Sequence, residues 1–294
     1  MYKFHARLAF LVFLSMMLFF HGGNASAALT KGIYITQSTL ENTTYINYLI
    51  GRAKKVGITT FIVDLDRPSS RYQTNIQLLK NNNIAYVARI TMFPGGGTPE
   101  QVHSESYWQK KYQLVKHALA YGANQIQLDY IRYNTKQPPS SQNAKDILKV
   151  IQWFKSRVNV PLQVDVFGVS SFGESKYIGQ NIKLFSSSVD VICPMVYPSH
   201  YVPFDVHVKI PYKTVYDSLA SIRDQFDSDQ LPFKLIPYIE LSNYHYLLSH
   251  EKKLNYIYAQ IQAAENAGAD GWYVWSPHNR YDSLFQILET RQVK

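Results

Sequence analysis

Residues 125–132 read Gln125-Ile126-Gln127-Leu128-Asp129-Tyr130-Ile131-Arg132, a short run in which apolar and polar side chains alternate. Alternation with a period of two predicts a β-strand. Ile126, Leu128 and Tyr130 then share one face, and Gln127 and Asp129 share the other. An apolar face must pack against other elements, so the polar face with Asp129 is expected on the opposite side of the sheet.

The same arrangement recurs along the chain. In residues 161–167, Leu162, Val164 and Val166 share one face, whereas Gln163 and Asp165 share the other. Eight runs are predicted as strands: 32–36, 60–66, 84–92, 125–131, 161–167, 189–197, 234–240 and 271–275. Segments of helical period separate them, and strands that alternate with amphipathic helices pair in parallel. Eight such units in about 250 residues predict a single (β/α)8 TIM barrel.

A doubly wound α/β sheet is the competing fold. That fold usually places a glycine-rich phosphate-binding turn after its first strand. The turn after Thr36 reads Gln37-Ser38-Thr39-Leu40 and contains no glycine. The barrel is therefore the better prediction.

The first 27 residues have the features of a secretory leader. Lys3 and Arg7 precede an apolar run over residues 8–20, and Ala25-Ser26-Ala27 follows it. We predict a signal peptide over residues 1–27, a barrel domain over 28–294, and no membrane-spanning segment after cleavage. The expected location is secreted, periplasmic or at the cell envelope.

Composition narrows the function classes. Of the 294 residues, 46% are hydrophobic and 17% charged, which excludes a disordered chain. The net charge of +9 is spread thinly, without a basic block, so no nucleic-acid partner is expected. An anionic envelope polymer would account for the charge equally well. The one cysteine, Cys193, lies in an apolar run and is predicted to be a buried core residue.

Carboxylates gather at the predicted strand ends. Asp129 and Asp165 should point into the barrel near its top, and Asp64 shares a face with Asp66 on the second strand. Arg89 is expected inside the third strand, and Glu240 shares a face with Ile236 and Tyr238 on the seventh. Several acids aimed at one mouth indicate a polar site. An internal ion-pair network of Arg89 with Asp64 or Asp129 is the structural alternative.

Aromatic residues gather at the same ends, among them Tyr130, Tyr197, Tyr201 and Trp275. Sugar rings stack on such side chains while their hydroxyl groups bond to acids, so the combination points toward carbohydrate. Metal chemistry is less well supported, because the histidines form no HxxxH or HxH pair. A divalent ion held by Asp64, Asp66 and Asp129 stays open as an alternative. No G-x-S-x-G nucleophile elbow occurs.

Several motifs together resemble one family. They are Lys31-Gly32-Ile33-Tyr34, Gln127-Leu128-Asp129-Tyr130-Ile131-Arg132-Tyr133, Asp165-Val166-Phe167-Gly168, Ile178-Gly179-Gln180, the string from Cys193 to Tyr201 (C-P-M-V-Y-P-S-H-Y), Gly271-Trp272 and Asn279-Arg280-Tyr281. The chain is similar, from about Leu29 to its last helix, to the DUF4015 group of bacterial glycoside hydrolases. The resemblance implies a TIM barrel related to the α-galactosidase and α-amylase type of enzyme. It also implies that Asp129 is the strand-four acid, Asp165 the strand-five acid, and Tyr197–Tyr201 a binding loop.

Two departures from the family pattern concern the site. Asn134 stands where the family usually has proline after the strand-four aromatic residue. Residues 236–240 read I-P-Y-I-E where the family usually reads R-P-W-L-Q, which alters the pocket wall and makes Glu240 particular to this chain.

Hydrolysis of a glycosidic bond generally needs two carboxyl groups. We expect Asp129 to be the nucleophile or base, with Arg132 favouring its ionised form, and Asp165 or Glu240 to be the general acid. The predicted substrate-binding residues are Asp64, Arg89, Tyr130, Arg132, Tyr197, His200, Tyr201 and Trp275. The substrate is expected to be a polysaccharide or oligosaccharide, and neither cofactor nor metal is predicted. Two alternatives stay open: a glycan-binding barrel without activity, and a metal-dependent hydrolase or deacetylase.

Overall fold

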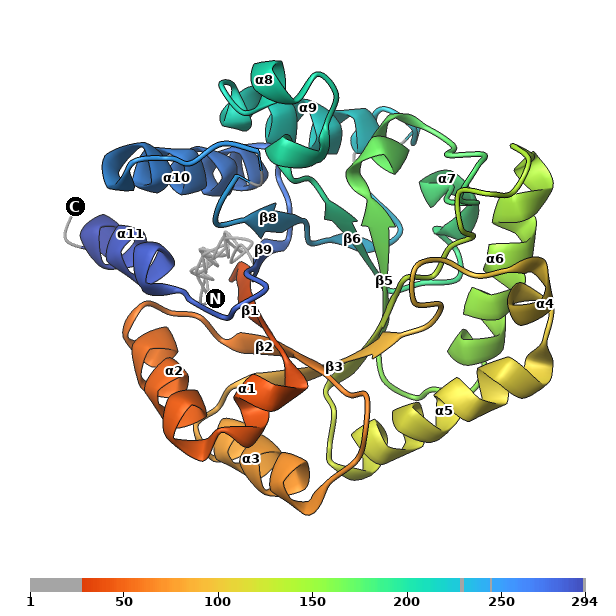
Figure 1. Ribbon diagram of the computed structural model, residues 1–294, viewed down its shortest axis with the longest axis horizontal. Helices are drawn as coiled ribbons and strands as arrows, with labels where there is room; N and C mark the ends of the chain where they lie inside the picture. Colours follow the sequence, from red (N-terminus) through yellow and green to blue (C-terminus); the bar gives the residue numbers. More distant parts are fainter. Residues whose placement is uncertain (1–27, 228–229, 244, 293–294) are drawn as a thin grey trace, which may run out of the picture.

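The computed structural model describes residues 28–227, 230–243 and 245–292 (Figure 1). The predicted signal peptide lies outside the described residues, and its cleavage stays a prediction. Within the described ranges, no helix is long and apolar enough to cross a membrane.

The strands form a closed parallel barrel. They are β1 (Thr30–Ile35), β2 (Thr60–Asp64), β3 (Ala85–Thr91), β4 (Gln125–Asp129), β5 (Leu162–Phe167), β6 (Val191–Met195), β7 (Lys234–Leu235), β8 (Tyr238–Glu240) and β9 (Gly271–Trp275). Except for β7 and β8, which both pair with β6, strands that are neighbours along the chain pair in parallel, and β1 pairs with β9 to close the ring. The predicted fold is confirmed, and each of the eight predicted runs contains strand.

The seventh predicted strand is interrupted. β7 pairs with β6 at Val191 and Ile192, and β8 pairs with β6 at Met195. Pro237 lies in the gap between β7 and β8, and proline has no N–H to donate to the ladder. The two short strands therefore occupy one position in the barrel.

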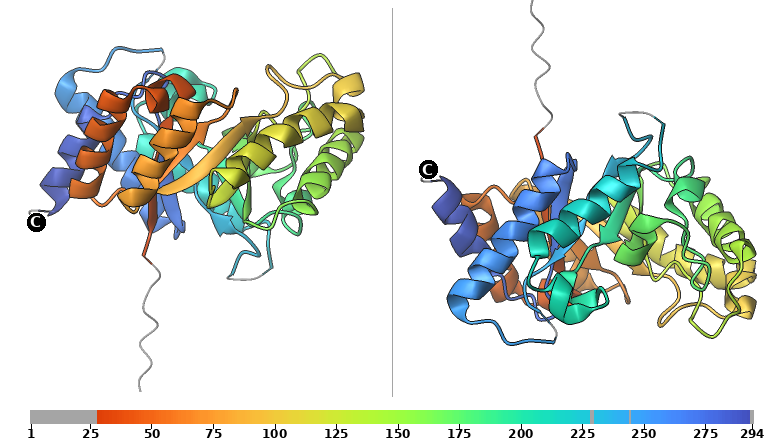
Figure 2. Two further views of the ribbon diagram at one scale, coloured as in Figure 1. Left: turned by 90° about the horizontal axis from the view of Figure 1, so that it is seen from below. Right: turned by 90° about the horizontal axis from the view of Figure 1, so that it is seen from above.

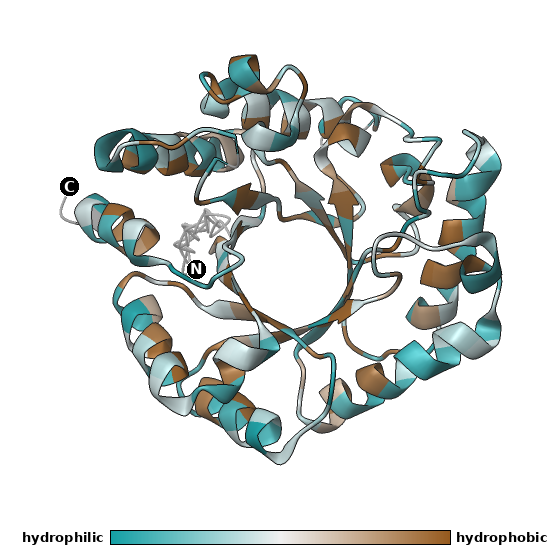
Figure 3. Ribbon diagram, viewed as in Figure 1, coloured by the Kyte–Doolittle hydropathy of each residue, from teal (hydrophilic) through white to brown (hydrophobic). Residues whose placement is uncertain are grey.

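Helices surround the ring of strands, as the view down the barrel and the two side views show (Figures 1 and 2). They are α1 (Gln37–Glu41), α2 (Thr43–Lys55), α3 (Ser70–Asn81), α4 (Pro99–Val102), α5 (Glu105–Ala120), α6 (Ser141–Lys155), α7 (Ile182–Phe185), α8 (Phe204–His207), α9 (Pro211–Arg223), α10 (His250–Asn266) and α11 (Asp282–Gln292), with 3₁₀ turns η1 (Gly168–Phe172) and η2 (Pro198–His200). Hydrophobic residues in these helices alternate with hydrophilic ones (Figure 3), as expected for helices with one face on the core.

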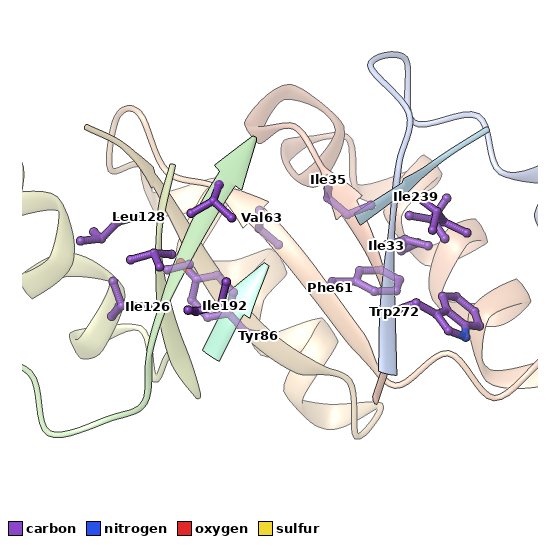
Figure 4. Packing of buried hydrophobic residues seen from close by; sticks show 14 of the residues in the cluster. Ile33, Ile35, Phe61, Val63, Tyr86, Ile126, Leu128, Ile192, Ile239 and Trp272 are labelled. Atoms are coloured by element: carbon purple, nitrogen blue, oxygen red, sulfur yellow. The ribbon is translucent and has the colours of Figure 1, made fainter. Parts of the chain in front are cut away.

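The larger apolar core lies between the strands and the helices. Ile126 and Leu128 of β4 belong to it, together with Phe61 and Trp272 (Figure 4). A smaller cluster fills the barrel interior and includes Cys193, which is fully buried as predicted. The period-two alternation therefore assigned the outward and inward faces of β4 correctly up to Asp129.

Tyr130 departs from the predicted alternation. The run was expected to continue as strand to Ile131, with Tyr130 facing outward, but β4 ends at Asp129. Tyr130 has φ 52°, in the left-handed region, so the chain turns at this residue. The side chain of Tyr130 therefore no longer follows the alternation of the strand. Tyr130 is 36% exposed and lines a pocket instead of the outer core.

Gly32 of β1 offers a test of the interior packing. A Cβ at this position would lie 2.6 Å from the Tyr273 ring and 2.9 Å from Ile62, both fully buried. We expect Gly32→Ala to lower the free energy of unfolding by about 1 to 3 kcal/mol, because a packed interior resists added volume. Urea denaturation measures this change.

Gly51 provides the matched control. It lies in α2, and a Cβ there meets nothing within 4 Å. Gly51→Ala should therefore raise stability by about 0.5 to 1 kcal/mol, as alanine does in a helix interior. Equal effects of the two substitutions would contradict the packing described here.

Candidate active site

A pocket of about 200 Å³ opens where the strands end. It is lined by Tyr34, Arg89, Asp129, Tyr130, Asp165, Phe167, Met195, Tyr197, His200, Tyr238 and Trp275. Ligand pockets usually measure roughly 300 to 1,000 Å³, so this one is sized for a small ring rather than a whole oligosaccharide. Its walls are mainly aromatic, and its acids come from β4 and β5.

Three carboxylates meet one guanidinium beside this pocket. Arg89 of β3 donates through Nη1 to Asp64 and through Nη2 to Asp129, and its Nε lies 3.8 Å from Asp165 Oδ2. The ion-pair network considered from the sequence is therefore present. Arg89, rather than Arg132, is the partner of Asp129. One cation cannot balance three anions, so the cluster favours retention of a proton on one of the acids.

Asp165 is the acid best placed to keep that proton. Burial raises its pKa well above the usual range, and the Asp129 carboxylate raises it further. Within the part of the chain that the structure describes, its Oδ1 has no hydrogen-bond partner. A neutral carboxyl group that lines the pocket can donate a proton to a bound ligand.

Asp129 has the opposite environment. Its Oδ1 accepts a hydrogen bond of 2.5 Å from the Tyr130 N–H, and its Oδ2 accepts from Arg89. Charge-assisted bonds of this kind favour a negatively charged carboxylate. Because Asp129 and Asp165 both contact Arg89, their carboxyl groups lie within the roughly 10 Å over which two-carboxylate hydrolysis operates.

Asp64 belongs to the cluster but does not line the pocket. It accepts hydrogen bonds from the Tyr34 hydroxyl and from Arg89, and thereby holds two side chains that do line it. Burial raises the pKa of Asp64, against the lowering effect of Arg89. The prediction that Asp66 shares its face is wrong: β2 ends at Asp64, and Asp66 lies exposed beyond the strand.

Aromatic side chains form the walls of the pocket. Tyr197 stacks on Trp275 with 5.5 Å between ring centroids and 20° between planes, and His200 packs edge-on to Tyr197 at 5.1 Å. Burial lowers the pKa of His200, so its imidazole is neutral at pH 7. On another side, the Arg132 guanidinium lies 4.9 Å from the centre of the Phe167 ring. Arg132 thus packs against Phe167 on that side of the pocket and does not line the pocket itself.

Besides Asp64 and Arg132, two more predicted site residues do not line the pocket, namely Glu240 and Tyr201. Glu240 is fully buried, and its carboxylate accepts hydrogen bonds from Ser199 and Tyr256. Burial raises the pKa of Glu240 to about 7. Tyr201 shares a hydrogen bond with Ser218 on α9. The geometry therefore favours Asp165 over Glu240 as the partner of Asp129.

Four residues that line the pocket are not among the predicted catalytic or substrate-binding residues: Tyr34, Phe167, Met195 and Tyr238. Alternation along β1 could have identified Tyr34, because Ile33 and Ile35 face the outer core. Tyr238 could have been found from its expected face in the same way. Among the described residues, no three His, Cys, Asp or Glu side chains are grouped as a metal ion would need.

Removing Arg89 should destabilise the fold strongly. Arg89→Met leaves buried carboxylates without their cation, and breaking a buried ion pair in this way costs about 3 to 5 kcal/mol. Urea denaturation at pH 7 measures the loss. The loss should shrink as the pH is lowered, because Asp64, whose pKa is raised by burial, then takes up a proton and no longer needs the cation.

The matched control is Lys213→Met, which breaks an exposed pair with Asp217 in α9. Its cost should stay below about 1 kcal/mol. If Arg89→Met were as stable as the control, Arg89 would not be needed to compensate the buried negative charge of the three acids.

Comparison with solved structures shows a shared fold at low sequence identity. An endo-1,4-beta-mannanase from Rhizomucor miehei superposes with a TM-score of 0.66 at 10% identity, over 90% of this chain and 95% of that one. An endo-beta-1,4-mannanase from Thermotoga petrophila gives 0.63 at 11%, over 91% and 77%. The spore cortex-lytic enzyme SleL from Bacillus cereus gives 0.62 at 11%, over 88% and 73%. At such identities the likeness concerns the barrel alone.

No curated protein matches the chain in sequence. A family model does match. The model named DUF4015, described as a "Putative glycosyl hydrolase domain", covers residues 100–281, more than half of the chain. The matched region contains Asp129, Asp165 and the segment 197–201, whereas Asp64 and Arg89 precede it. The chain, with its closed barrel and its paired acids at the strand ends, therefore belongs to the DUF4015 family of glycosyl hydrolases.

Proposed function

We propose that the protein hydrolyses glycosidic bonds in a bacterial or envelope polysaccharide, with Asp129 and Asp165 as its two carboxyl groups. The observation that carries this proposal is the contrast between them. Asp165 is buried and its pKa is raised, whereas Asp129 accepts hydrogen bonds from Arg89 and from the Tyr130 N–H. Two neighbouring acids in such different environments suit the roles of acid and of nucleophile or base.

In the proposed reaction, a sugar ring stacks against the Tyr197 and Trp275 wall. Asp165 transfers its proton to the leaving glycosidic oxygen as the bond from that oxygen to the anomeric carbon breaks. Asp129 then either attacks the anomeric carbon, giving a glycosyl ester that water hydrolyses, or takes a proton from the attacking water. Arg89 keeps Asp129 oriented and charged.

Export would bring the protein to such a polymer, and we include it in the proposal on the strength of the predicted leader. Two of the structurally similar proteins are named endo-β-1,4-mannanases, which suggests mannan as a further substrate to test. We therefore add β-1,4-mannan to bacterial exopolysaccharides and peptidoglycan glycans as substrates for a screen.

The test incubates purified protein with each glycan and measures new reducing ends. The Asp129→Asn variant runs in parallel as the matched inactive form. We expect one class of glycan to be cleaved by the wild-type protein alone. Binding of a glycan without new reducing ends would support the glycan-binding alternative, and loss of activity with a chelator would support the metal-dependent one.

A further inference from the structure

Glu240 makes a specific set of contacts that the proposed reaction leaves unused. At the end of β8, its Oε1 accepts a hydrogen bond of 2.8 Å from the Ser199 N–H, and its Oε2 accepts one of 2.6 Å from Ser199 Oγ. Both carboxylate oxygens therefore bind one residue of the loop after β6. A side chain fixed at two points loses most of its freedom to rotate.

Ser199 is the middle residue of the turn η2, which runs from Pro198 to His200. Tyr197 precedes this turn and His200 ends it, and both line the pocket. No side-chain cap holds the start of the turn. The bonds between Ser199 and Glu240 therefore fix the middle of this turn, in addition to the backbone bond from the His200 N–H to the Tyr197 carbonyl oxygen.

Helix α10 fixes Glu240 from the other side. The Tyr256 hydroxyl donates to Glu240 Oε1 at 2.5 Å. Gln260 accepts from the Glu240 N–H at 3.1 Å and donates to the Glu240 carbonyl oxygen at 3.0 Å. Glu240 thus connects a rigid helix to the turn that presents Tyr197 and His200.

We propose that Glu240 is a positioning residue, which holds the pocket wall formed by Tyr197 and His200 through its two bonds to Ser199. The consequence for catalysis rests on the proposed function, because Tyr197 is one of the two rings on which the sugar would stack. The structural part of the inference stands on the contacts alone.

The contacts also predict which substitutions of Glu240 preserve the position of the turn. The groups that face the Glu240 carboxylate are Ser199, Tyr256 of α10 and, nearby, Tyr197. A glutamine can accept from the Ser199 N–H and the Tyr256 hydroxyl while its amide donates to Ser199 Oγ. An alanine leaves these buried groups without a partner.

A spectroscopic test needs no substrate. Trp275 stacks on Tyr197, so its fluorescence reports the position of the wall. Subtracting the spectrum of Trp275→Phe in each background isolates the Trp275 emission from that of the other tryptophans. We expect Glu240→Ala to shift this emission in the folded protein, and Glu240→Gln to leave it at the wild-type position.

Asp146→Asn is the matched control, a buried acid on α6 that does not line the pocket. It should leave the Trp275 emission unchanged. An unchanged emission in folded Glu240→Ala would overturn the proposal. If Glu240→Ala does not fold, Ser199→Ala decides, because it removes the bond to Oε2: a shifted emission supports the proposal and an unchanged one overturns it.

Kinetics on the glycan found in the screen give the second readout. Glu240→Ala should raise KM by about tenfold with a smaller change in kcat, and Glu240→Gln should restore the wild-type KM. A lower kcat with unchanged KM would contradict a positioning role. Absence of hydrolysis by the wild-type protein would count against the proposed function and leave the spectroscopic result standing.

Discussion

Asp129→Asn is expected to lower kcat on the cleaved glycan on the order of 10⁴-fold, the scale on which enzymes lose activity without a nucleophile or its activating base. Asparagine fits the same space but carries no charge, so it can neither attack the anomeric carbon nor accept a proton from water. Binding should persist, because Tyr197 and Trp275 remain. Initial rates and an independent binding isotherm measure the two effects separately.

The matched control is Asp190→Asn. Asp190 pairs with Lys155 away from the pocket and is 39% exposed, so its loss should leave kcat near the wild-type value. A thermal melt excludes unfolding of either variant as the cause. Wild-type turnover by Asp129→Asn would remove Asp129 from the proposed mechanism.

Asp165→Asn is expected to lower kcat by about 10²- to 10⁴-fold on a natural glycan, the usual contribution of a general acid. The loss should be much smaller on an aryl glycoside of the same sugar, because a phenolate leaves without being protonated. The ratio of rates on the two substrates, compared between variant and wild type, measures this difference. An equal loss on both substrates would contradict the role of acid.

The raised pKa of Asp165 sets the direction in which activity and stability change with pH. The pKa of Asp165 is raised by burial and by Asp129, so the active, protonated form persists above the usual range of an aspartic acid and is lost as the pH rises through that raised pKa. The alkaline limb of the wild-type pH profile should therefore be absent from the residual activity of Asp165→Asn. The buried neutral form is favoured on folding, so stability contributed by Asp165 falls as pH rises. At alkaline pH, Asp165→Asn should be at least as stable as wild type.

Alternation within each strand allowed much of the site to be predicted. Gln127 and Asp129 on β4, and Gln163 and Asp165 on β5, face the interior as predicted, because a strand with one apolar face can pack in only one orientation. The prediction failed beyond the last paired residue. Asp66 and Tyr130 both follow the end of a strand, where the backbone no longer alternates.

Glu240 shows a different limit of prediction from the sequence. Its expected face was shared with Tyr238, which does line the pocket, yet Glu240 is covered by the turn that contains Ser199. The path of that loop depends on residues distant in sequence, among them Tyr256 and Gln260 of α10. No local pattern specifies such a contact.

Local periodicity in the sequence is enough to predict the eight strand units, the faces of β4 and β5, and the presence of acids and aromatic rings at one end of the barrel. The folded barrel is needed to see which acids share Arg89, which of them favours a proton, and which side chains reach the pocket. Those properties depend on burial and on distances between residues such as Arg89 and Asp165, which come together only when the barrel closes.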